Sequence, residues 1–164
     1  MKTLVAYYSF TGNNAKLANY LKDKMGCDIF AVQTQKKMSM WGILMSLIFR
    51  KKVVLQDYKI DLKAYDKIVL VSSVWFGNVA FPFKTFLQRE KDNIKNYQFI
   101  SICLGGQKEN LEKALTKIIE KPPEKVVEIS FKKLKEENKL KTSDKLSDDD
   151  FDSIKKDIDQ VISN

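Results

Sequence analysis

The sequence predicts a single α/β domain, a three-layer sandwich in which helices cover both faces of a five-stranded parallel sheet. Short apolar runs alternate with helical patterns along the chain, as in folds built on a parallel sheet. The run from Lys67 to Val74 is apolar over four consecutive residues, which is typical of a strand buried on both faces. A length of 164 residues without an internal repeat suits one domain, so residues 1–164 are treated as one unit.

The elements follow in order. The predicted strands are the apolar run that begins at Leu4, Cys27–Val32, Lys67–Val74, Tyr97–Leu104 and Val126–Phe131, the last as an edge strand. Apolar residues at helical spacing predict four helices, marked by Ala15, Leu17, Ala18, Leu21 and Met25; by Phe83, Phe86 and Leu87; by Leu111, Leu115, Ile118 and Ile119; and by Phe151, Ile154, Ile158 and Val161. We expect Ser147 to cap the last helix, whose first turn carries Asp148 to Asp150. The Lys/Glu-rich stretch Lys132–Lys145 is predicted as an exposed loop.

Composition excludes several classes of site. The chain has no histidine, which removes histidine-based triads and histidine-ligated zinc, and we predict no metal site. Cys27 and Cys103 lack C-x-x-C spacing and are read as buried reduced thiols. Since Met1-Lys2 runs straight into the first strand, we expect no signal peptide and a cytoplasmic protein. The net charge of +8 favours acidic partners or anionic surfaces, although it also fits a Lys-rich composition with solvated charges, and we expect no role in binding nucleic acid.

The turn after the first strand is the most informative segment. Residues 4–14 read LVAYYSFTGNN, an apolar run followed by hydroxyl groups, a glycine and two amides, after which a helix begins. Backbone N–H groups, these side chains and the positive end of a helix dipole together suit a phosphate. The turn holds no Lys or Arg, so neutral hydrogen bonds would hold the phosphate. An ordinary helix cap is the alternative.

Two further turns follow predicted strands at the same edge of the sheet, where ligands bind in such folds. Residues 72–78 read SSVWFGN, with two aromatic residues beside a glycine, and residues 103–107 read CLGGQ. Together the three turns predict a site for a phosphate attached to a planar ring. Each part has a simpler interpretation, because Trp75 and Phe76 could be core or rim residues and Gly105-Gly106 could serve a tight turn.

Competing nucleotide-binding folds lack their signatures here. No G-x-G-x-x-G follows the first strand, and the chain has no G-x-x-x-x-G-K-[ST], so a Rossmann dinucleotide site and a P-loop are disfavoured. A receiver domain needs acidic residues after the first and third strands, where this chain has Tyr8-Ser9 and Ser72-Ser73.

These motifs resemble the flavodoxin family. The resemblance is carried by residues 7–14 (YYSFTGNN) and 73–78 (SVWFGN), followed by Pro82 and Phe86, and it runs from Lys2 to about Lys133. It implies a flavodoxin-like sheet in the order 2-1-3-4-5 that binds FMN. The first loop is similar to the family's phosphate signature, Trp75 would stack on or flank the ring, and Gly77 would present its backbone to the flavin N5. The implied FMN-binding residues are Ser9, Phe10, Thr11, Gly12, Asn13, Asn14, Ser73, Val74, Trp75, Phe76, Gly77, Asn78, Leu104, Gly105, Gly106 and Gln107, the last four at the pyrimidine edge.

The chain departs from the family pattern in three places. Asn14 stands where threonine is commoner, Gly105-Gly106 lacks the tyrosine that carriers often stack on the ring, and the chain is basic where carriers are acidic. The resemblance implies an FMN-binding redox protein, either an electron carrier or a small flavin-dependent oxidoreductase, with no catalytic residue assigned. The alternatives are a quinone- or protoporphyrinogen-type flavin reductase and a flavodoxin-fold binding module that has lost flavin.

The partner is expected to be a redox protein or a small-molecule electron acceptor. Within Lys36–Lys52, the stretch Met38–Phe49 is apolar nearly all round and has basic residues on both sides. We interpret it mainly as the crossover helix between the second and third strands. The alternative is a contact with a partner, a quinone or a membrane surface, since twelve residues are too few to span a bilayer.

Overall fold

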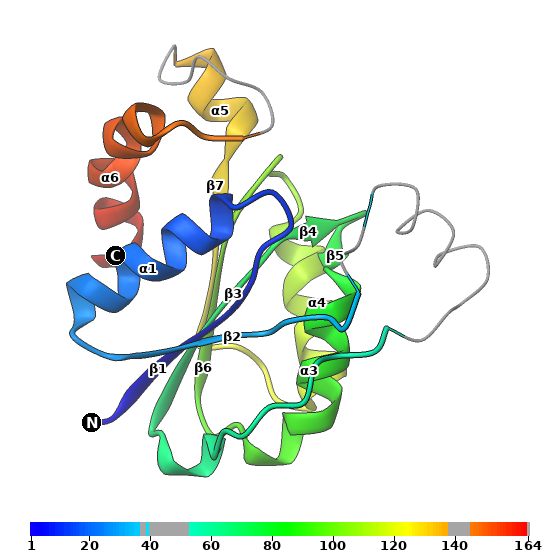
Figure 1. Cartoon of the computed structure of the whole chain (residues 1–164). Coiled ribbons are helices and arrows are strands. Elements are labelled where there is room, and N and C mark those ends of the chain that lie inside the picture. Colours follow the sequence, from blue (N-terminus) through cyan, green and yellow to red (C-terminus); the bar gives the residue numbers. More distant parts are fainter. Residues whose placement is uncertain (37–38, 40–52, 138–144, 164) are drawn as a thin grey trace.

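The computed structural model describes residues 1–36, 39, 53–137 and 145–163. At its centre lies a five-stranded sheet in the order β2-β1-β3-β6-β7 (Figure 1). Counted along the chain, this is the predicted arrangement 2-1-3-4-5, and the strand pairs within this sheet are all parallel. The prediction of a parallel sheet with this strand order is therefore confirmed.

The predicted strands form with small shifts of their ends. They are β1 (Thr3–Tyr8), β2 (Asp28–Ala31), β3 (Lys67–Ser72), β6 (Tyr97–Cys103) and β7 (Lys125–Ser130). The register pairs Tyr8 with Ser72 and Cys103 with Ser130. Because paired residues end level with each other, the loops that follow β1, β3 and β6 leave the same edge of the sheet.

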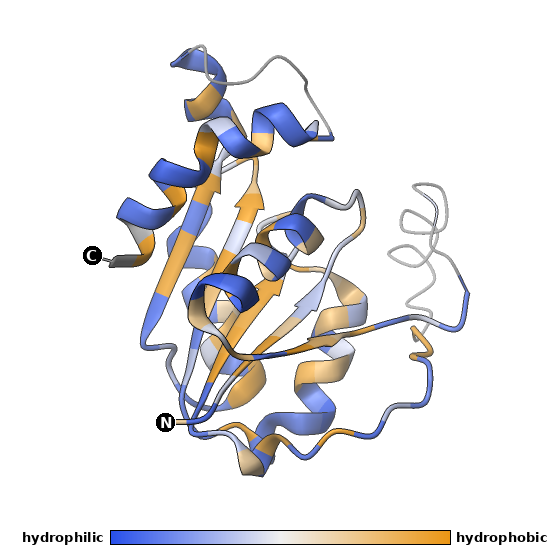
Figure 2. Cartoon of the chain, turned by 60° about the vertical axis from the view of Figure 1, so that its left-hand side comes forward, coloured by the Kyte–Doolittle hydropathy of each residue, from blue (hydrophilic) through white to orange (hydrophobic). Residues whose placement is uncertain are grey.

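Helices cover both faces of the sheet (Figure 1). On one face lie α1 (Asn13–Met25) and α6 (Asp148–Ser163), and on the other lie α3 (Phe81–Glu90) and α4 (Lys108–Ile119). Short turns of 3-10 helix, η1 (Leu62–Ala64) and η2 (Lys91–Asn93), lie in the connections. Figure 2 shows apolar strands between helices whose outer faces are hydrophilic, so a separate core fills each side of the sheet.

The two cores follow from alternation along the strands. On β1, Leu4 and Ala6 contribute to the core under α3 and α4, whereas Val5 contributes to the core under α1 and α6. The predicted apolar residues of α1, Leu17, Ala18 and Leu21, are buried in the second core. Two-sided burial explains why the middle of β3, Ile68–Val71, is apolar without a break.

The N-terminus of α6 is capped as expected. The Ser147 hydroxyl accepts a hydrogen bond from the Asp150 N–H at 3.0 Å, and the Asp150 carboxylate accepts one from the Ser147 N–H at 3.3 Å. This reciprocal pair satisfies helix donors that would otherwise be unpaired. Phe151, Ile154 and Ile158 are buried on the inner face of the helix.

Two elements differ from expectation. The first part of the predicted loop Lys132–Lys145 is helical, since α5 spans Phe131–Glu136. The helix forms because Ser130 caps it, its hydroxyl accepting from the Lys133 N–H at 3.3 Å, and because Phe131 and Leu134 share a buried face despite the polar composition. In addition, β4 (Val74–Trp75) and β5 (Asn78–Val79) form an antiparallel hairpin that was not predicted. The predicted crossover helix in Met38–Phe49 lies outside the described residues, apart from Ser39.

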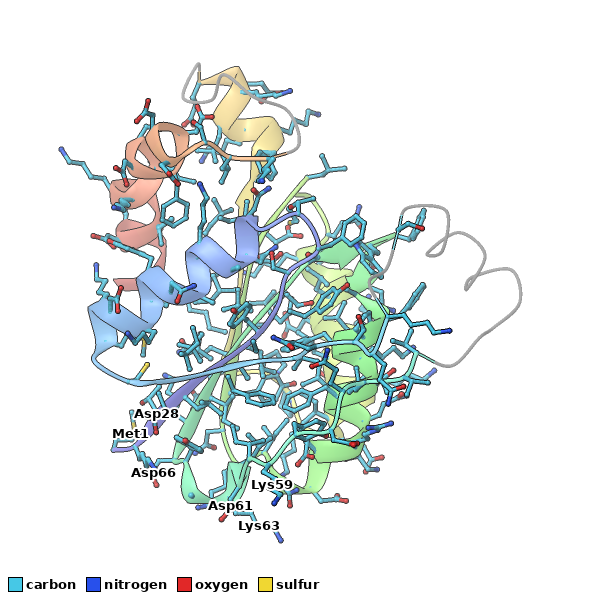
Figure 3. All side chains as sticks on the ribbon, viewed as in Figure 1. Met1, Asp28, Lys59, Asp61, Lys63 and Asp66 are labelled. Carbon is cyan, nitrogen blue, oxygen red and sulfur yellow. The ribbon has the colours of Figure 1, made fainter. Side chains whose placement is uncertain are left out.

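The opposite end of the sheet is rich in charge. Figure 3 labels Met1, Asp28, Lys59, Asp61, Lys63 and Asp66 together at the end away from the β4–β5 hairpin. There the Lys2 N–H donates to the Asp66 carboxylate at 2.7 Å, and the Lys2 ammonium pairs with Asp28 at 3.5 Å. In the described part of the chain, none of the helices has the length and apolar character needed to cross a membrane.

Candidate functional site

The first loop joins β1 to α1. Gly12 lies at the N-cap position with a φ of 100° and provides no side-chain cap. The Ser9 hydroxyl accepts a hydrogen bond from the Gly12 N–H at 3.1 Å, which tightens the turn. Thr11 is exposed, and the space where a side chain on Gly12 would project is open. The loop thus presents a hydroxyl side chain and a helix N-terminus beside open space, an arrangement that favours anions.

The amide side chains of Asn13 and Asn14 serve the fold. Both are buried. The Asn13 Oδ1 accepts from the Leu146 N–H at 2.9 Å, and Asn14 forms hydrogen bonds with the N–H and the carbonyl of Ile102. Any contribution of these two residues to a bound phosphate would therefore come from their backbone N–H groups.

The second loop contains the β4–β5 hairpin. Phe76 and Gly77 form its turn with φ angles of 53° and 73°, so both central residues are left-handed, as in a type I′ turn. Glycine adopts this conformation readily, whereas for phenylalanine it is unusual and costs energy. The Phe76 side chain is 80% exposed, so burial of the ring does not offset that cost.

The neighbouring Trp75 lies in an aromatic cluster. Its ring meets those of Tyr8, Phe10 and Phe81 edge-on, with centroids 6.0, 5.7 and 5.6 Å away. Such edge-to-face contacts stabilise partly buried aromatic side chains. Trp75 therefore connects the first loop, the hairpin and the start of α3, while Phe76 is the aromatic residue that projects into solvent.

The third loop joins β6 to α4. Leu104 is 77% exposed, and Gly105 and Gly106 have φ angles of 92° and 77°. A Cβ on Gly105 would lie 2.2 Å from the Ser130 Oγ, so a side chain at position 105 has no room. The Ser130 hydroxyl also donates to the Leu104 carbonyl at 2.9 Å, which holds the loop against the end of β7.

Specific contacts join the three loops. The Phe10 N–H of the first loop donates to the Ser73 hydroxyl of the second at 3.2 Å. A Cβ on Gly77 would lie 2.7 Å from the Gln107 Oε1, which places the hairpin against the third loop. Asn110 of α4 donates to the same Oε1 at 3.1 Å. The structure thus brings the predicted segments 9–14, 73–78 and 104–107 together at one edge of the sheet.

Charge is sparse among the described residues of these loops. Lys16, in the first turn of α1, is ion-paired with Asp148 of α6. Burial raises the pKa of Tyr8 to about 12, and burial together with the nearby charge of Glu128 raises the pKa of Cys103 to about 11. Both groups are therefore neutral at physiological pH. Among the residues that the structure describes, no cluster of potential metal ligands is found.

Two residues of β7 were not predicted to belong to the site. Glu128 accepts hydrogen bonds from the Gln107 N–H, and Ser130 contacts Leu104 and Gly105. Their signal in the sequence is weak, since it consists of two polar residues spaced two apart at the end of a strand that also begins with a polar residue, Lys125. Nothing in that pattern indicates that both reach the preceding loop.

A hollow of about 700 Å³ lies along β7, outside the three loops. Its lining includes Lys108, Glu128, Lys133 and Asp157, and none of the predicted site residues takes part. We place the candidate site at the three loops and not in this hollow.

Comparison with solved structures gives flavodoxin-like folds. A flavoprotein from Lactobacillus acidophilus NCFM, whose structure is a complex with FMN, matches with a TM-score of 0.68 at 22% identity, over 77% of this chain and 92% of that one. A protein from Bacteroides eggerthii DSM 20697 matches with a TM-score of 0.69 at 16% identity, over 98% of both chains. A flavodoxin from the domain Archaea matches over the whole of both chains with a TM-score of 0.52 at 17% identity.

No family model and no curated protein matches the sequence. At the identities of the solved structures, the likeness shows the fold, which is flavodoxin-like.

Proposed function

We propose that this protein binds FMN non-covalently at the three loops and acts in electron transfer. The observation that carries the proposal is that a helix N-terminus suited to a phosphate and an apolar surface suited to a planar ring lie at the same edge of the sheet. The first loop offers a phosphate the N-terminus of α1 without a side-chain cap, and the other two loops offer a planar ring the exposed side chains of Phe76 and Leu104.

The residues present fit FMN in their chemistry. Thr11 and Ser9 supply hydroxyl groups, and the loop backbone supplies N–H donors, so a phosphate would be held by neutral hydrogen bonds and the helix dipole. Lys16 is engaged with Asp148, so the proposal does not depend on a cation. The space beside Gly12 and Gly106 is open, and a ligand can approach the backbone at both points.

The ring would lie against the second and third loops. Phe76 and Leu104 give apolar contact from two different loops, and these loops meet where the Gln107 Oε1 lies against Gly77. When bound, FMN supplies one- or two-electron transfer, while the protein determines its orientation and its potential. Trp75 stabilises the second loop through its ring contacts with Tyr8, Phe10 and Phe81.

The similar flavoprotein from Lactobacillus acidophilus is a complex with FMN, which supports FMN as the ligand of this fold here. The partner proposed for this chain is a redox protein or a small-molecule electron acceptor. Contact with a quinone or membrane surface through Met38–Phe49 stays a prediction, because that stretch falls almost entirely outside the described residues.

The absorbance spectrum of the purified protein, before and after FMN is added and unbound flavin is removed, tests the proposal. Retained flavin absorbance supports it, and a protein that retains none would instead be a module that has lost flavin. Turnover of NAD(P)H with a quinone would indicate an oxidoreductase. Reversible reduction of bound flavin without turnover would indicate an electron carrier.

A further inference from the structure

The Glu128 carboxylate holds the third loop by accepting hydrogen bonds from the backbone of that loop. The Gln107 N–H donates to both carboxylate oxygens of Glu128, at 3.1 Å each, and the Cys103 thiol lies 3.7 Å from one of them. Glu128 is on β7, the strand next to the one that this loop leaves. A carboxylate that accepts from a backbone N–H forms one of the stronger hydrogen bonds in proteins. The loop is therefore fixed at its far end, where α4 begins.

Ser130 fixes the near end of the same loop. Its hydroxyl donates to the Leu104 carbonyl at 2.9 Å, and Gly105 packs directly on its side chain. Glu128 and Ser130 are two residues apart on one strand, so their side chains project on the same side of the sheet. The end of β7 thus holds both ends of the loop Leu104–Gln107.

Gln107 connects the third loop to the β4–β5 hairpin. Its Oε1 lies against Gly77, and Asn110 donates to that same oxygen at 3.1 Å. The position of the Gln107 backbone, which Glu128 fixes, therefore also determines how closely the third loop approaches the second. These are the two loops that would contact the ring of FMN.

We infer that Glu128 is a positioning residue for FMN, which sets the spacing of the two ring-contacting loops by binding the Gln107 N–H. The inference rests on the proposed function. Glu128 acts here through its hydrogen bond and not through contact with the ligand. An amide oxygen at the same position can accept the same bond, whereas a side chain too short to reach cannot.

The variants Glu128→Ala and Glu128→Gln separate these cases, and Glu124→Ala is the matched control. Glu124 comes just before β7 at the other end of the sheet, where it pairs with Lys67 at 3.1 Å. FMN and riboflavin are titrated into each flavin-free protein. Glu128→Thr, with a side chain that favours strands, is a second truncation for the case in which the alanine variant is too unstable.

We expect Glu128→Ala to weaken FMN and riboflavin by the same factor, about tenfold, because both carry the ring that the loop contacts. Glu128→Gln should restore both affinities to within about threefold of the original protein, and Glu124→Ala should leave them unchanged. In the flavin-free proteins, amide hydrogen exchange in residues 104–110 should be faster in the alanine variant and unchanged in the glutamine variant.

Unchanged affinity and exchange in Glu128→Ala, in a protein that binds FMN, would overturn this inference alone. A loss in Glu128→Gln as large as in Glu128→Ala would also overturn it, because the charge and not the bond would then be responsible. Failure of the unmodified protein to bind FMN would overturn the proposed function, and the role of Glu128 in binding with it.

Discussion

The side-chain amide of Asn14 forms two hydrogen bonds with the backbone of Ile102. Its Oδ1 accepts from the Ile102 N–H at 2.9 Å, and its Nδ2 donates to the Ile102 carbonyl at 3.1 Å. The register between β3 and β6 ends at the pair Val71 and Ile100, so Asn14 bonds β6 just beyond the end of that pairing. One residue at the start of α1 thereby aligns the first loop with the strand that leads to the third.

Asn14→Ala should destabilise the protein. The change leaves the buried N–H and carbonyl of Ile102 without these partners, at a cost of about 2–4 kcal/mol in the free energy of unfolding. Asn19→Ala is the control, because Asn19 is exposed on the same helix and bonds only the local Ala15 carbonyl among the contacts described. Urea denaturation measures both, and equal losses would contradict the role given to Asn14.

The two glycines of the third loop should respond differently to alanine. Both have a left-handed φ, so either change strains the backbone by about 1 kcal/mol or more. Only at Gly105 does a Cβ also collide with Ser130, whereas at Gly106 the space is open. Gly105→Ala should therefore cost about 1–3 kcal/mol more than Gly106→Ala in unfolding free energy. A smaller loss for Gly105→Ala would contradict the packing described.

The two aromatic residues of the second loop should have different roles, Trp75 in stability and Phe76 in FMN binding. Trp75→Ala removes ring contacts to Tyr8, Phe10 and Phe81 and should lower the free energy of unfolding by about 2–4 kcal/mol. Phe76→Ala removes an exposed ring and should leave stability almost unchanged while weakening FMN about threefold to tenfold. Thermal melting and FMN titration of both variants check this division. A Phe76→Ala variant with unchanged FMN affinity would remove Phe76 from the proposed site.

Stability should fall at alkaline pH because of Cys103. Burial, with a further contribution from the charge of Glu128, raises the pKa of its thiol from 9.0 to about 11 in the folded protein. The folded state thus favours the neutral thiol, and this contribution is complete below about pH 9 and is lost as the pH rises through about 11. Between about pH 8 and about pH 10.5, the unmodified protein should lose about 2 kcal/mol more than Cys103→Ala.

Urea denaturation of the two proteins across that pH range measures the difference. Cys27→Ala is the control for a less buried thiol whose pKa is raised by burial as well. Parallel curves for the unmodified protein and Cys103→Ala would show that the thiol does not carry this pH dependence.

The sheet could be predicted from the sequence because a continuous apolar run such as Ile68–Val71 by itself indicates a strand that is buried on both faces. The α5 helix could not, because its polar composition hides a buried pair, Phe131 and Leu134, and a cap that forms only once β7 is in place. The same limit applies to the site. The segments 9–14, 73–78 and 104–107 could be identified from residue types, but the internal bonds of Asn14 and the contact of Glu128 with Gln107 depend on distant elements.

Competition between FMN and riboflavin for the flavin-free protein shows whether the first loop binds the phosphate of FMN. Riboflavin has the same ring and lacks the phosphate. We expect FMN to bind at least about a hundredfold more tightly, and Thr11→Ala to weaken FMN by about 1–3 kcal/mol while leaving riboflavin unchanged. Equal affinities for the two flavins, or no binding of either, would show that the first loop is not a binding site for the phosphate of FMN.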